Sequence, residues 1–355
     1  MARVGIVTFH YALNSGAVLQ AYGLAKAIEQ MGHDVHVIDY CSRGARRAYY
    51  PRGFRHWGFR SHGGPIAAFI RRRRFRQFRE KHLPLSLRTY LNNEDFAFHP
   101  PDVDCLVCGS DQVWNIRTAS CGGFDPVFFL ASPLETRARR ISYGACFGPG
   151  ELGDYQETIR TLISRFDHLS VRDLRSQDIV RKLVGREAVH VLDPSFLVDY
   201  DPITPEPVLH EPYVLVYCME RNPFFERAVA LLHRLSGWRV ISVNTGFSDA
   251  GVASTAGPLE WLSLVRHAAF VCTNSFHGTC FSLIWQKRFA TLPIGGGMQF
   301  RLDDLLQTAG LQDRLVRSED ELAAALDGKV DYEGAAPRLH QAYQRSIGFL
   351  REALG

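Results

Sequence analysis

The residues best suited to chemistry follow a short apolar run, in the segment Val271-Cys-Thr-Asn-Ser-Phe-His-Gly-Thr-Cys-Phe281. The pattern predicts a strand, then a turn, and then a helix that starts near Gly278. Unpaired N–H groups and the positive end of the helix dipole favour anions at such a start. His277 would lie where an imidazole can exchange a proton with a bound phosphate or carboxylate ester. The alternative is a packed histidine that ends a strand, and the polar Asn274 and Ser275 keep both interpretations open.

Polar loops after other predicted strands are further candidates, because ligands of open α/β sheets bind beyond the carboxyl ends of the strands. The first loop lies in Phe9–Ala17, where His10 follows an apolar run and Asn14 or Ser15 is expected to cap the next helix. Gly16 would let a ligand approach the backbone closely. The loop lacks the glycine patterns of dinucleotide and ATP sites, so those ligands have little support. Plain helix capping is the alternative to a binding role.

The second loop, Cys108–Asn115, places small, acidic and amide side chains beside an aromatic ring. Ser110, Asp111 and Gln112 offer hydrogen bonds to hydroxyl groups, and Trp114 offers an apolar ring face. This combination is typical of a sugar-binding site. The alternative is a turn followed by a tryptophan packed in the core.

Two arginines are placed to bind an anion. Arg172 ends a predicted strand within Ser170–Asp173, and its guanidinium suits a phosphate or a carboxylate through two hydrogen bonds. Asp173 is expected to cap the following helix, and an ion pair of Arg172 with Asp173 or a neighbouring carboxylate is the alternative. Arg301 follows Gly295–Gly297 at another predicted helix start. It would close on an anion there, or pair with the aspartates that follow it.

Short apolar runs alternate with segments of helical spacing, and this alternation decides the fold class. Runs that are apolar throughout fit strands covered on both faces, so the N-terminal part predicts a parallel, doubly wound α/β half. Its predicted strands are Arg3–Phe9, Asp34–Tyr40, Val103–Cys108, Arg140–Gly144, His168–Arg172 and Ala188–Leu192. Its predicted helices are Ala17–Met31, Ile66–His82, Glu151–Phe166 and Asp173–Val184.

A proline-rich segment without periodicity, Asp199–Pro212, is the predicted linker. After it the alternation restarts as a second, smaller α/β half. We therefore predict two Rossmann-like domains, 1–198 and 199–335, with a cleft between them, and a terminal helix in 336–355 that packs back on the first domain. The strands of the second half are Tyr213–Met219, Arg239–Asn244, Phe270–Thr273 and Phe289–Leu292, and its helices are Pro223–Ser236, Pro258–His267 and Gly278–Gln286.

The composition is that of an ordinary soluble globular protein, with 46% hydrophobic and 22% charged residues in a chain of 355. No run reaches the ~18 consecutive apolar residues of a membrane span, and the N-terminus lacks the features of a signal peptide. The sequence therefore predicts a cytoplasmic protein. Eight cysteines, most of them in or beside apolar runs, are interpreted as reduced core residues. Cys105 and Cys108 have C-x-x-C spacing, but no second pair follows at zinc-site distance, so no metal is predicted.

The net charge is only +4, but cations are concentrated in residues 43–88. Aromatic residues interleave with these cations, which favours either nucleic acid or an anionic membrane surface that carries a lipid-linked substrate. We prefer the membrane, because the rest of the chain has the pattern of a small-molecule enzyme. A solvated helix and loop is the alternative. The cations are Arg43, Arg46, Arg47, Arg52, Arg55, Arg60, Arg71 to Arg74, Arg76, Arg79, Lys81 and Arg88.

Several segments together resemble the polysaccharide pyruvyl transferase family, in an order and spacing that extend over nearly the whole chain. The resemblance implies a two-domain fold like that of the GT-B glycosyltransferases. It also implies transfer of the pyruvyl group of phosphoenolpyruvate to a sugar as a ketal. The segments are Gly5-Ile-Val-Thr-Phe-His10, Leu13-Asn-Ser-Gly-Ala-Val-Leu-Gln20, Gly109-Ser-Asp-Gln-Val-Trp114, Ser170-Val-Arg-Asp173, Asp193-Pro194 and Thr273-Asn-Ser-Phe-His-Gly278.

The resemblance also implies roles for particular residues. His277 matches the histidine proposed as general acid in the family, and Arg172 matches an arginine of the donor site. Many members have a second arginine two positions before the histidine, where this chain has Ser275. Either Arg172 and Arg301 hold the anion of the donor instead, or the donor is different. The predicted donor site is Arg172, Asn274, Ser275, Gly278 and Arg301, and the predicted acceptor site is His10, Asn14, Ser15, Gly16, Ser110, Asp111, Gln112 and Trp114.

Three functions follow as hypotheses. The first is a pyruvyl transferase of cell-surface polysaccharide biosynthesis, with phosphoenolpyruvate as co-substrate and no cofactor. Its acceptor would be a lipid-linked or nucleotide-linked sugar at the inner face of the cell membrane. The second is a nucleotide-sugar glycosyltransferase of GT-B architecture, since fold alone does not separate the two. The third is a non-enzymatic basic module that binds membrane or RNA through residues 43–88, although nucleic acid is the less expected partner.

Overall fold

The computed structural model describes residues 1–49, 64–118, 121–131, 137–207, 209–243, 247 and 251–355. The chain forms two compact units, and the main boundary lies between Val198 and Asp199, at the start of the proline-rich segment. Two shorter segments differ from a simple N-terminal and C-terminal division. Of the described residues, 64–78 group with the second unit, and Gln341–Gly355 groups with the first. The two units are therefore described separately.

The first unit is built on a seven-stranded sheet in the order β3-β2-β1-β4-β5-β6-β7, in which every pair is parallel. The sequence predicted all of these strands except β3. Most residues of β3 are polar or only half-buried, so it lacks the apolar run that marks the others. The strands are β1 (Arg3–Val7), β2 (Asp34–Tyr40), β3 (Leu85–Tyr90), β4 (Cys105–Cys108), β5 (Arg139–Ala145), β6 (His168–Val171) and β7 (Val189–His190).

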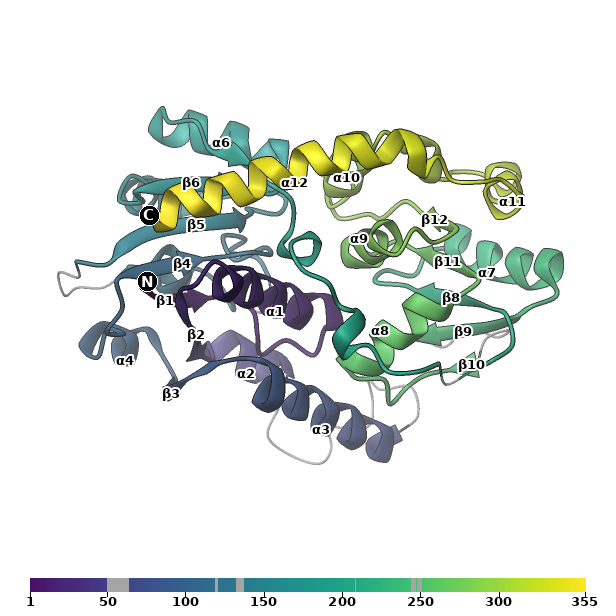
Figure 1. Ribbon diagram of the computed structural model, residues 1–355, viewed down its shortest axis with the longest axis horizontal. Helices are drawn as coiled ribbons and strands as arrows, with labels where there is room; N and C mark the ends of the chain where they lie inside the picture. Colours follow the sequence, from purple (N-terminus) through teal and green to yellow (C-terminus); the bar gives the residue numbers. More distant parts are fainter. Residues whose placement is uncertain (50–63, 119–120, 132–136, 208, 244–246, 248–250) are drawn as a thin grey trace. The chain divides into compact units, whose positions relative to one another are not determined.

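Both faces of this sheet are covered. Val7 of β1 joins a core that contains Trp114 and Phe128, while Val4 and Ile6 point to the opposite face and are equally buried. This double burial explains why the strands are apolar throughout. The helices of the unit are α1 (Ser15–Gln30), α2 (Arg43–Tyr49), α4 (Asn93–Phe98), α5 (Gln156–Ile163) and α6 (Leu174–Val184) (Figure 1).

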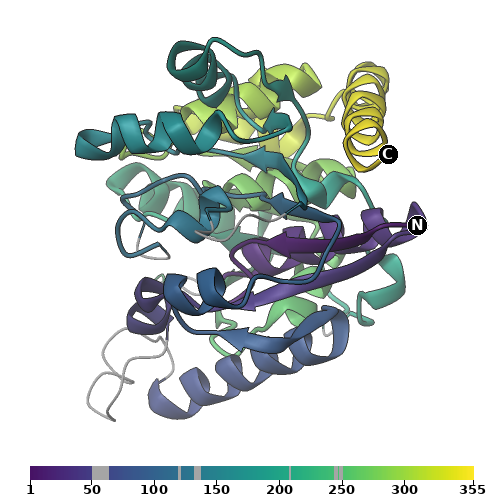
Figure 2. The same cartoon turned by 90° about the vertical axis from the view of Figure 1, so that its left-hand side faces the viewer.

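Two long helices contribute residues to both units. They are α3 (Gly64–His82) and α12 (Tyr332–Leu354). The last part of α12 packs on the first unit, where Phe349 lies 6.3 Å from the ring of Tyr143. As a result the two chain ends lie side by side in the first unit (Figures 1 and 2).

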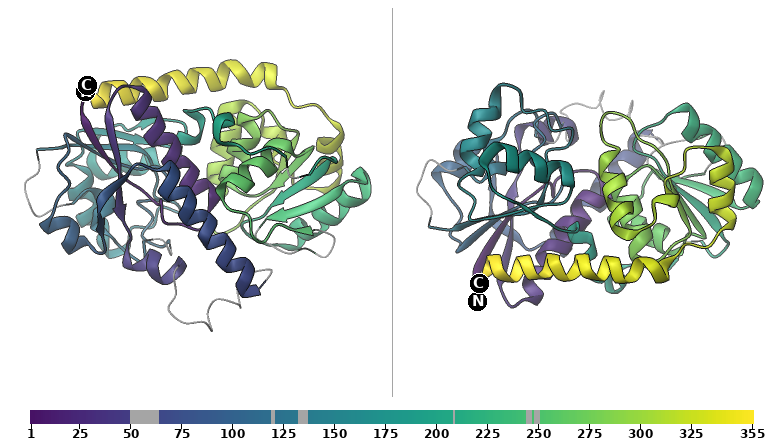
Figure 3. Two further views of the ribbon diagram at one scale, coloured as in Figure 1. Left: turned by 60° about the horizontal axis from the view of Figure 1, so that its bottom comes forward. Right: turned by 90° about the horizontal axis from the view of Figure 1, so that it is seen from above.

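The second unit contains a five-stranded sheet in the order β10-β9-β8-β11-β12, again parallel throughout. Val214 and Val216 of β8 pack with helix α7, and Tyr217 faces the other way onto Trp261 of α8, at 5.2 Å between rings. Helices therefore lie on both faces of this sheet as well (Figure 3). The elements are β8 (Tyr213–Tyr217), β9 (Arg239–Val243), β10 (Gly251–Val252), β11 (Phe270–Thr273), β12 (Phe289–Thr291), α7 (Pro223–Ser236), α8 (Pro258–His267), α9 (Phe276–Ile284), α10 (Phe300–Ala309) and α11 (Glu319–Asp327).

The strand order of each sheet reverses at one place. In the first sheet the reversal lies between β1 and β4, and in the second it lies between β8 and β11. Open α/β sheets bind ligands beyond the carboxyl ends of the strands at such a point. The loops after these four strands are therefore where a site is expected.

The structure divides the basic block, residues 43–88, between elements. Arg43, Arg46 and Arg47 lie on α2 of the first unit, and the arginines 71–74 and 76 lie in the part of α3 that groups with the second. Residues 50–63, with Arg52, Arg55 and Arg60, are outside the described part of the chain. The remaining cations of the block, Arg79, Lys81 and Arg88, lie in the first unit.

The eight cysteines are buried thiols, as predicted for core residues. Burial raises the pKa of the thiols of Cys108 and Cys272, which keeps them protonated and unreactive. None of the helices in the described ranges combines the length and the apolar character that a bilayer crossing requires.

Candidate functional site

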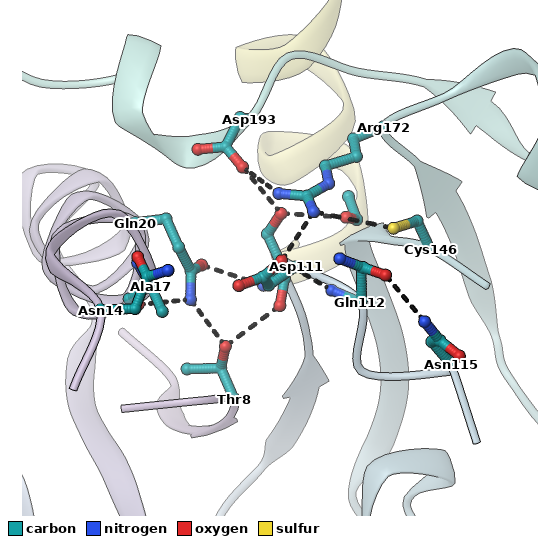
Figure 4. Close-up of polar contacts among 12 residues, drawn as sticks. Thr8, Asn14, Ala17, Gln20, Asp111, Gln112, Asn115, Cys146, Arg172 and Asp193 are labelled. Atoms are coloured by element: carbon teal, nitrogen blue, oxygen red, sulfur yellow. Dashed lines mark hydrogen bonds and ion pairs between the residues drawn. The ribbon is translucent and has the colours of Figure 1, made fainter. Parts of the chain in front are cut away.

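Arg172 lies at the centre of a buried ion-pair cluster in the first unit (Figure 4). Its two terminal nitrogens donate to Asp193 Oδ2 and Asp111 Oδ1, each at 2.7 Å. The side chains of Arg172 and Asp193 are fully buried, and that of Asp111 is 13% exposed. A guanidinium held by two carboxylates has its charge compensated within the unit. The structure thus contains the ion pairs named as the alternative for Arg172, and its role as the donor's anion ligand stays a prediction.

The ion-pair partners of Arg172 are Asp111 and Asp193, whereas sequence proximity had suggested Asp173. Asp173 caps α6 instead, as its carboxylate accepts from the Ser176 amide at 2.7 Å. Asp111 and Asp193 reach Arg172 because β4, β6 and β7 end at the same edge of the parallel sheet. The arrangement therefore depends on strand order and not on sequence proximity.

Ser110 extends this cluster toward β1. Its hydroxyl donates to Gly144 O at 2.9 Å and contacts Asp193 Oδ2 at 3.2 Å. Its amide donates to Gln20 Oε1 at 3.2 Å, and Gln20 Nε2 in turn donates to the hydroxyl of Thr8 at 2.9 Å (Figure 4). Ser110 is completely buried, so the structure assigns it to this network and corrects its predicted contact with an acceptor.

Trp114 is a core residue. It is fully buried, its indole N–H donates to Phe128 O at 3.0 Å, and its ring is stacked on Phe129 and packed against Phe147 and Phe166. Aromatic side chains cover the ring on several sides, which corrects the prediction that it receives a sugar face. The packed tryptophan named as the alternative is what the structure contains.

Gln112 and Asp111 remain partly exposed at this loop. Asn115 Nδ2 donates to Gln112 Oε1 at 2.7 Å, and the Gln112 amide donates to Asp111 Oδ1 at 2.9 Å. Asp111 has a backbone φ of 77°, in the left-handed region, so these contacts hold an unusual turn. Of the residues predicted in this loop, these two retain access to a ligand.

The loop after β1 supplies the N-cap and the first turn of α1. Asn14 is the N-cap of α1, where its side chain accepts from the Ala17 amide at 3.2 Å. Ser15 and Gly16 form the buried first turn of the helix. The capping alternative is therefore correct for Asn14, and the predicted acceptor contacts of Ser15 and Gly16 are corrected because both lie inside the fold.

His10 is buried and bound on both sides of its ring. Nδ1 lies 3.1 Å from Thr8 O, and Nε2 lies 3.2 Å from Asp39 Oδ1. Burial alone would raise the pKa of the Asp39 carboxyl, but hydrogen bonds from His10, Thr89 and Tyr11 bring it below its ordinary value. His10 thus belongs to a polar cluster at the edge of the sheet, which corrects its predicted direct contact with an acceptor.

In the second unit, Asn274 links the two strands at the reversal point. Its Oδ1 accepts from the Met219 amide and its Nδ2 donates to Glu220 O, both at 2.7 Å. Met219 and Glu220 follow β8, and Asn274 follows β11. The predicted donor residue Asn274 therefore positions the loops and does not project its amide outward.

The turn between β11 and α9 is ordered by neutral hydrogen bonds. Thr273 Oγ1 donates to Tyr217 O at 2.6 Å and accepts from the Ser275 amide at 3.0 Å. Ser275 is the N-cap of α9, and its hydroxyl accepts from the Gly278 amide at 3.3 Å. A Cβ on Gly278 would overlap the side chain of Thr273, so this position requires a glycine. The helix starts at Phe276, two residues before the predicted start.

His277 lies in the first turn of α9 and is 6% exposed. Its ring packs edge-on at 5.4 Å from that of Phe276. The guanidinium carbon of Arg301 lies 5.6 Å from the centre of the same Phe276 ring. Arg301 is the second residue of α10, in the predicted helix. A cation and an imidazole are therefore brought to the same turn in the second unit.

Sequence reasoning gave no role to three residues that organise the first unit. Gln20 and Asp193 complete the network around Ser110, and Asp39 binds His10. The available signal was position, because Asp193 lies three residues after β7, directly after the predicted strand Ala188–Leu192, and Asp39 is the penultimate residue of β2. No group of histidine, cysteine and carboxylate side chains suited to a metal occurs among the residues that the structure describes.

The two parallel sheets, each with one reversal of strand order, define an α/β protein with two Rossmann-like domains of the GT-B class. A family model for polysaccharide pyruvyl transferase matches residues 14–294. The chain belongs to the polysaccharide pyruvyl transferase family.

Two solved structures with similar folds are UDP-GlcNAc 2-epimerases. UDP-GlcNAc 2-epimerase from Methanocaldococcus jannaschii is 12% identical, with 99% of this chain and 100% of that chain covered and a TM-score of 0.53. The enzyme from Neisseria meningitidis, bound to UDP-GlcNAc, is 8% identical, with 100% and 99% covered and a TM-score of 0.51. At these identities the likeness shows the fold alone. No curated protein matches the sequence.

Proposed function

We propose that this protein transfers the pyruvyl group of phosphoenolpyruvate to a sugar as a ketal, in the biosynthesis of a cell-surface polysaccharide. The observation that carries the proposal is the place of His277, in the first turn of α9 beyond the reversal point of the second sheet. A helix start favours the anionic groups of the donor. The imidazole supplies a proton within reach of the same place.

The proposed reaction uses His277 as general acid. His277 protonates the methylene carbon of phosphoenolpyruvate, which makes C2 cationic, and a sugar hydroxyl attacks C2. Phosphate then leaves, and a second hydroxyl of the same sugar closes the ketal. One of the two hydroxyl protons restores His277 and the other passes to the departing phosphate, so atoms and charge balance with hydrogen phosphate as the leaving group.

Arg301 is the arginine that we assign to the donor anion. It shares the Phe276 contact with His277, within the same unit. Arg172, the other candidate from the sequence, is held by two carboxylates in the first unit. The absence of an arginine at Ser275 is therefore offset by a cation that reaches the turn from α10.

The test is a comparison of donor turnover in variants of His277. With phosphoenolpyruvate and candidate sugars, the parent protein is expected to release phosphate and to add about 70 Da to the sugar, the mass of a pyruvyl ketal. His277→Gln removes the acid and should reduce the rate at least ~100-fold. His233→Ala, an exposed histidine of α7, is the matched control and should keep the parent rate. A His277→Gln protein that works at the parent rate excludes the acid assignment.

The same experiment separates this proposal from the glycosyltransferase hypothesis. Phosphoenolpyruvate should raise the melting temperature of the parent protein, since ligand binding stabilises the folded state. A protein stabilised by UDP, with no response to phosphoenolpyruvate and no phosphate release, would be a nucleotide-sugar enzyme instead.

We extend the proposal to the place of action, a cytoplasmic protein at the inner face of the cell membrane. On α3, Ile66 and Phe69 are 76% and 54% exposed, and Arg73 and Arg76 are exposed on the same helix. Apolar and basic side chains together favour an anionic bilayer surface. The protein should sediment with phosphatidylglycerol vesicles, and Ile66→Asp with Phe69→Asp should abolish this. Equal sedimentation of parent and variant argues against the contact.

A further inference from the structure

A cavity of about 550 Å³ lies in the first unit, beyond the carboxyl end of β2. It is separate from the residues that the sequence predicted for the acceptor. Its walls come from β2, α2, the start of α4 and the loop before Phe128. The lining residues used below are Tyr40, Arg43, Arg47, Asn92, Phe124 and Asp125.

Two cations belong to one wall. Arg43 and Arg47 are four residues apart on α2, so they share one side of the helix, and both are exposed. Arg46 lies between them but does not line the cavity, because its guanidinium donates to Leu91 O at 2.6 Å. This bond ties α2 to the segment after β3, which fixes the wall that carries the two arginines.

The same wall is fixed on a second side by a contact between backbones. A Cβ on Gly44 would overlap the backbone of Gly122, and a Cβ on Gly122, which has a φ of +68°, would overlap Gly44. Both positions therefore require glycine. Ala45 is buried and its amide donates to the Ser42 hydroxyl at 3.0 Å. The arginines stand on a short helix whose place is set by packing.

The buried side of the cavity is polar and hydrogen-bonded. The hydroxyl of Tyr40 donates to Asp125 Oδ2 at 2.7 Å, and the Val127 amide donates to Asp125 Oδ1 at 3.1 Å. Burial raises the pKa of the Asp125 carboxyl, and the bonds from Tyr40 and Val127 offset part of this effect. With two guanidinium groups and one carboxylate, the charged lining is positive overall.

An aromatic surface completes the cavity. Phe124 lies in its wall, stacked on Tyr155 with 4.7 Å between ring centres and 16° between planes, and 5.5 Å from the ring of Phe129. Its partly exposed ring gives this wall an apolar surface. Asn92, whose Oδ1 caps α4 by accepting from the Asp95 amide at 2.7 Å, also has an amide group that can donate to a hydroxyl or a phosphate.

We propose that this cavity binds the phosphorylated end of the sugar acceptor, with the phosphate or diphosphate on Arg43 and Arg47. The assignment of this ligand as an acceptor rests on the proposed pyruvyl transfer. Arginine pairs recognise phosphate groups through several charge-assisted hydrogen bonds. A diphosphate is common to lipid-linked and nucleotide-linked sugars, and the cavity recognises this shared chemistry.

The test is equilibrium binding to the full-length protein without donor. Glucose 1-phosphate, UDP-glucose and a short-chain prenyl diphosphate glucose serve as probes, with glucose as the neutral probe. The tighter of the two diphosphate probes identifies the source of the acceptor. The double variant Arg43→Gln, Arg47→Gln should weaken the phosphorylated probes roughly 30-fold or more. Arg181→Gln, an exposed arginine of α6, is the control and should bind as the parent does.

Several outcomes would overturn the proposal. Equal affinity of the double variant and the parent, or equal affinity of the parent for glucose and glucose 1-phosphate, rules out this cavity as a phosphate site. Displacement of glucose 1-phosphate by phosphoenolpyruvate would make it a donor site. If the double variant transfers pyruvyl groups at the parent rate with an unchanged acceptor KM, the cavity is not the acceptor site, and the proposed function is unaffected. If binding of the probes depends on the two arginines but the parent protein does not turn over phosphoenolpyruvate, the proposed function is wrong, and the cavity is a sugar-phosphate site.

Discussion

The carboxyl edges of the two sheets carry polar networks of different kinds. In the first unit the network is charged, with Arg172 between Asp111 and Asp193. In the second unit the network around the turn to α9 is neutral. Asn274 is hydrogen-bonded to the main chain just after β8, and Thr273 to the main chain of β8 itself. Both networks follow from parallel strands that end together. They differ in that the first network contains a cation paired with two carboxylates, whereas the second consists of neutral hydrogen bonds.

Under the proposed function, this difference separates a structural cluster from the site for chemistry. Two carboxylates already bind the guanidinium of Arg172 in the first network. The neutral hydrogen bonds of the second network hold the main chain, and they leave His277 and Arg301 as its titratable and charged members. A strand-end position alone therefore does not define function, and the proposal also depends on the charges of the neighbouring side chains.

The largest effect should come from breaking the charged network. Arg172→Ala leaves the buried Asp193 and the partly buried Asp111 without their cation, which should lower the free energy of unfolding by roughly 3–5 kcal/mol. Urea unfolding followed by circular dichroism measures this. The matched change Arg181→Ala removes an exposed pair with Asp178 and should cost less than about 1 kcal/mol.

One result for Arg172→Ala would show that the first network binds the donor. If Arg172→Ala had the stability of the parent and had lost only the thermal shift caused by phosphoenolpyruvate, Arg172 would be a donor ligand. Arg172→Lys is a useful second variant, because it keeps the charge but loses the geometry that serves two carboxylates at once. An intermediate stability for this variant is expected.

The sequence predicted the architecture well because burial leaves a clear pattern. Strands covered on both faces must be apolar, so β1, β2, β4, β8 and β11 could be located without the structure. The edge strand β3 could not, because its residues are half-exposed and lie inside the basic block. Helix caps such as Asn14 and Asp173 were also predicted, since capping depends on local hydrogen bonds.

The strand-end loops were predicted in position, but the contacts of their side chains were not. The sequence located the strand-end loops, yet it could not show that Trp114 points into the core, because the direction of a side chain depends on packing. Nor could it pair Arg172 with Asp111 and Asp193, which are 61 and 21 residues away. Such contacts need the order of the strands. The position of His277 was easier to predict, because the helix start beside it is formed by residues of the same segment.

A smaller effect should come from acidification, and it tests whether the first unit depends on charge beyond Arg172. The folded-state pKa of Asp39 lies below its ordinary value, through hydrogen bonds from His10, Thr89 and Tyr11 that outweigh the opposite effect of burial. A lowered folded pKa stabilises the protein above the unfolded pKa of about 3.9, and this stabilisation is lost as the pH falls through the folded pKa. Asp39→Asn should therefore cost roughly 1–2 kcal/mol at neutral pH and progressively less below about pH 4.

The measurement is the difference in the free energy of unfolding between parent and Asp39→Asn at several pH values from 7 to about 2.5. Asp154→Asn, an exposed carboxyl of the same unit, is the control and should give a small difference throughout. A difference for Asp39→Asn that stays constant over this range would show that its hydrogen bonds stabilise the fold without the charge. The first unit would then resemble the neutral network of the second, and Arg172 with its two carboxylates would be the exception at that edge of the sheet.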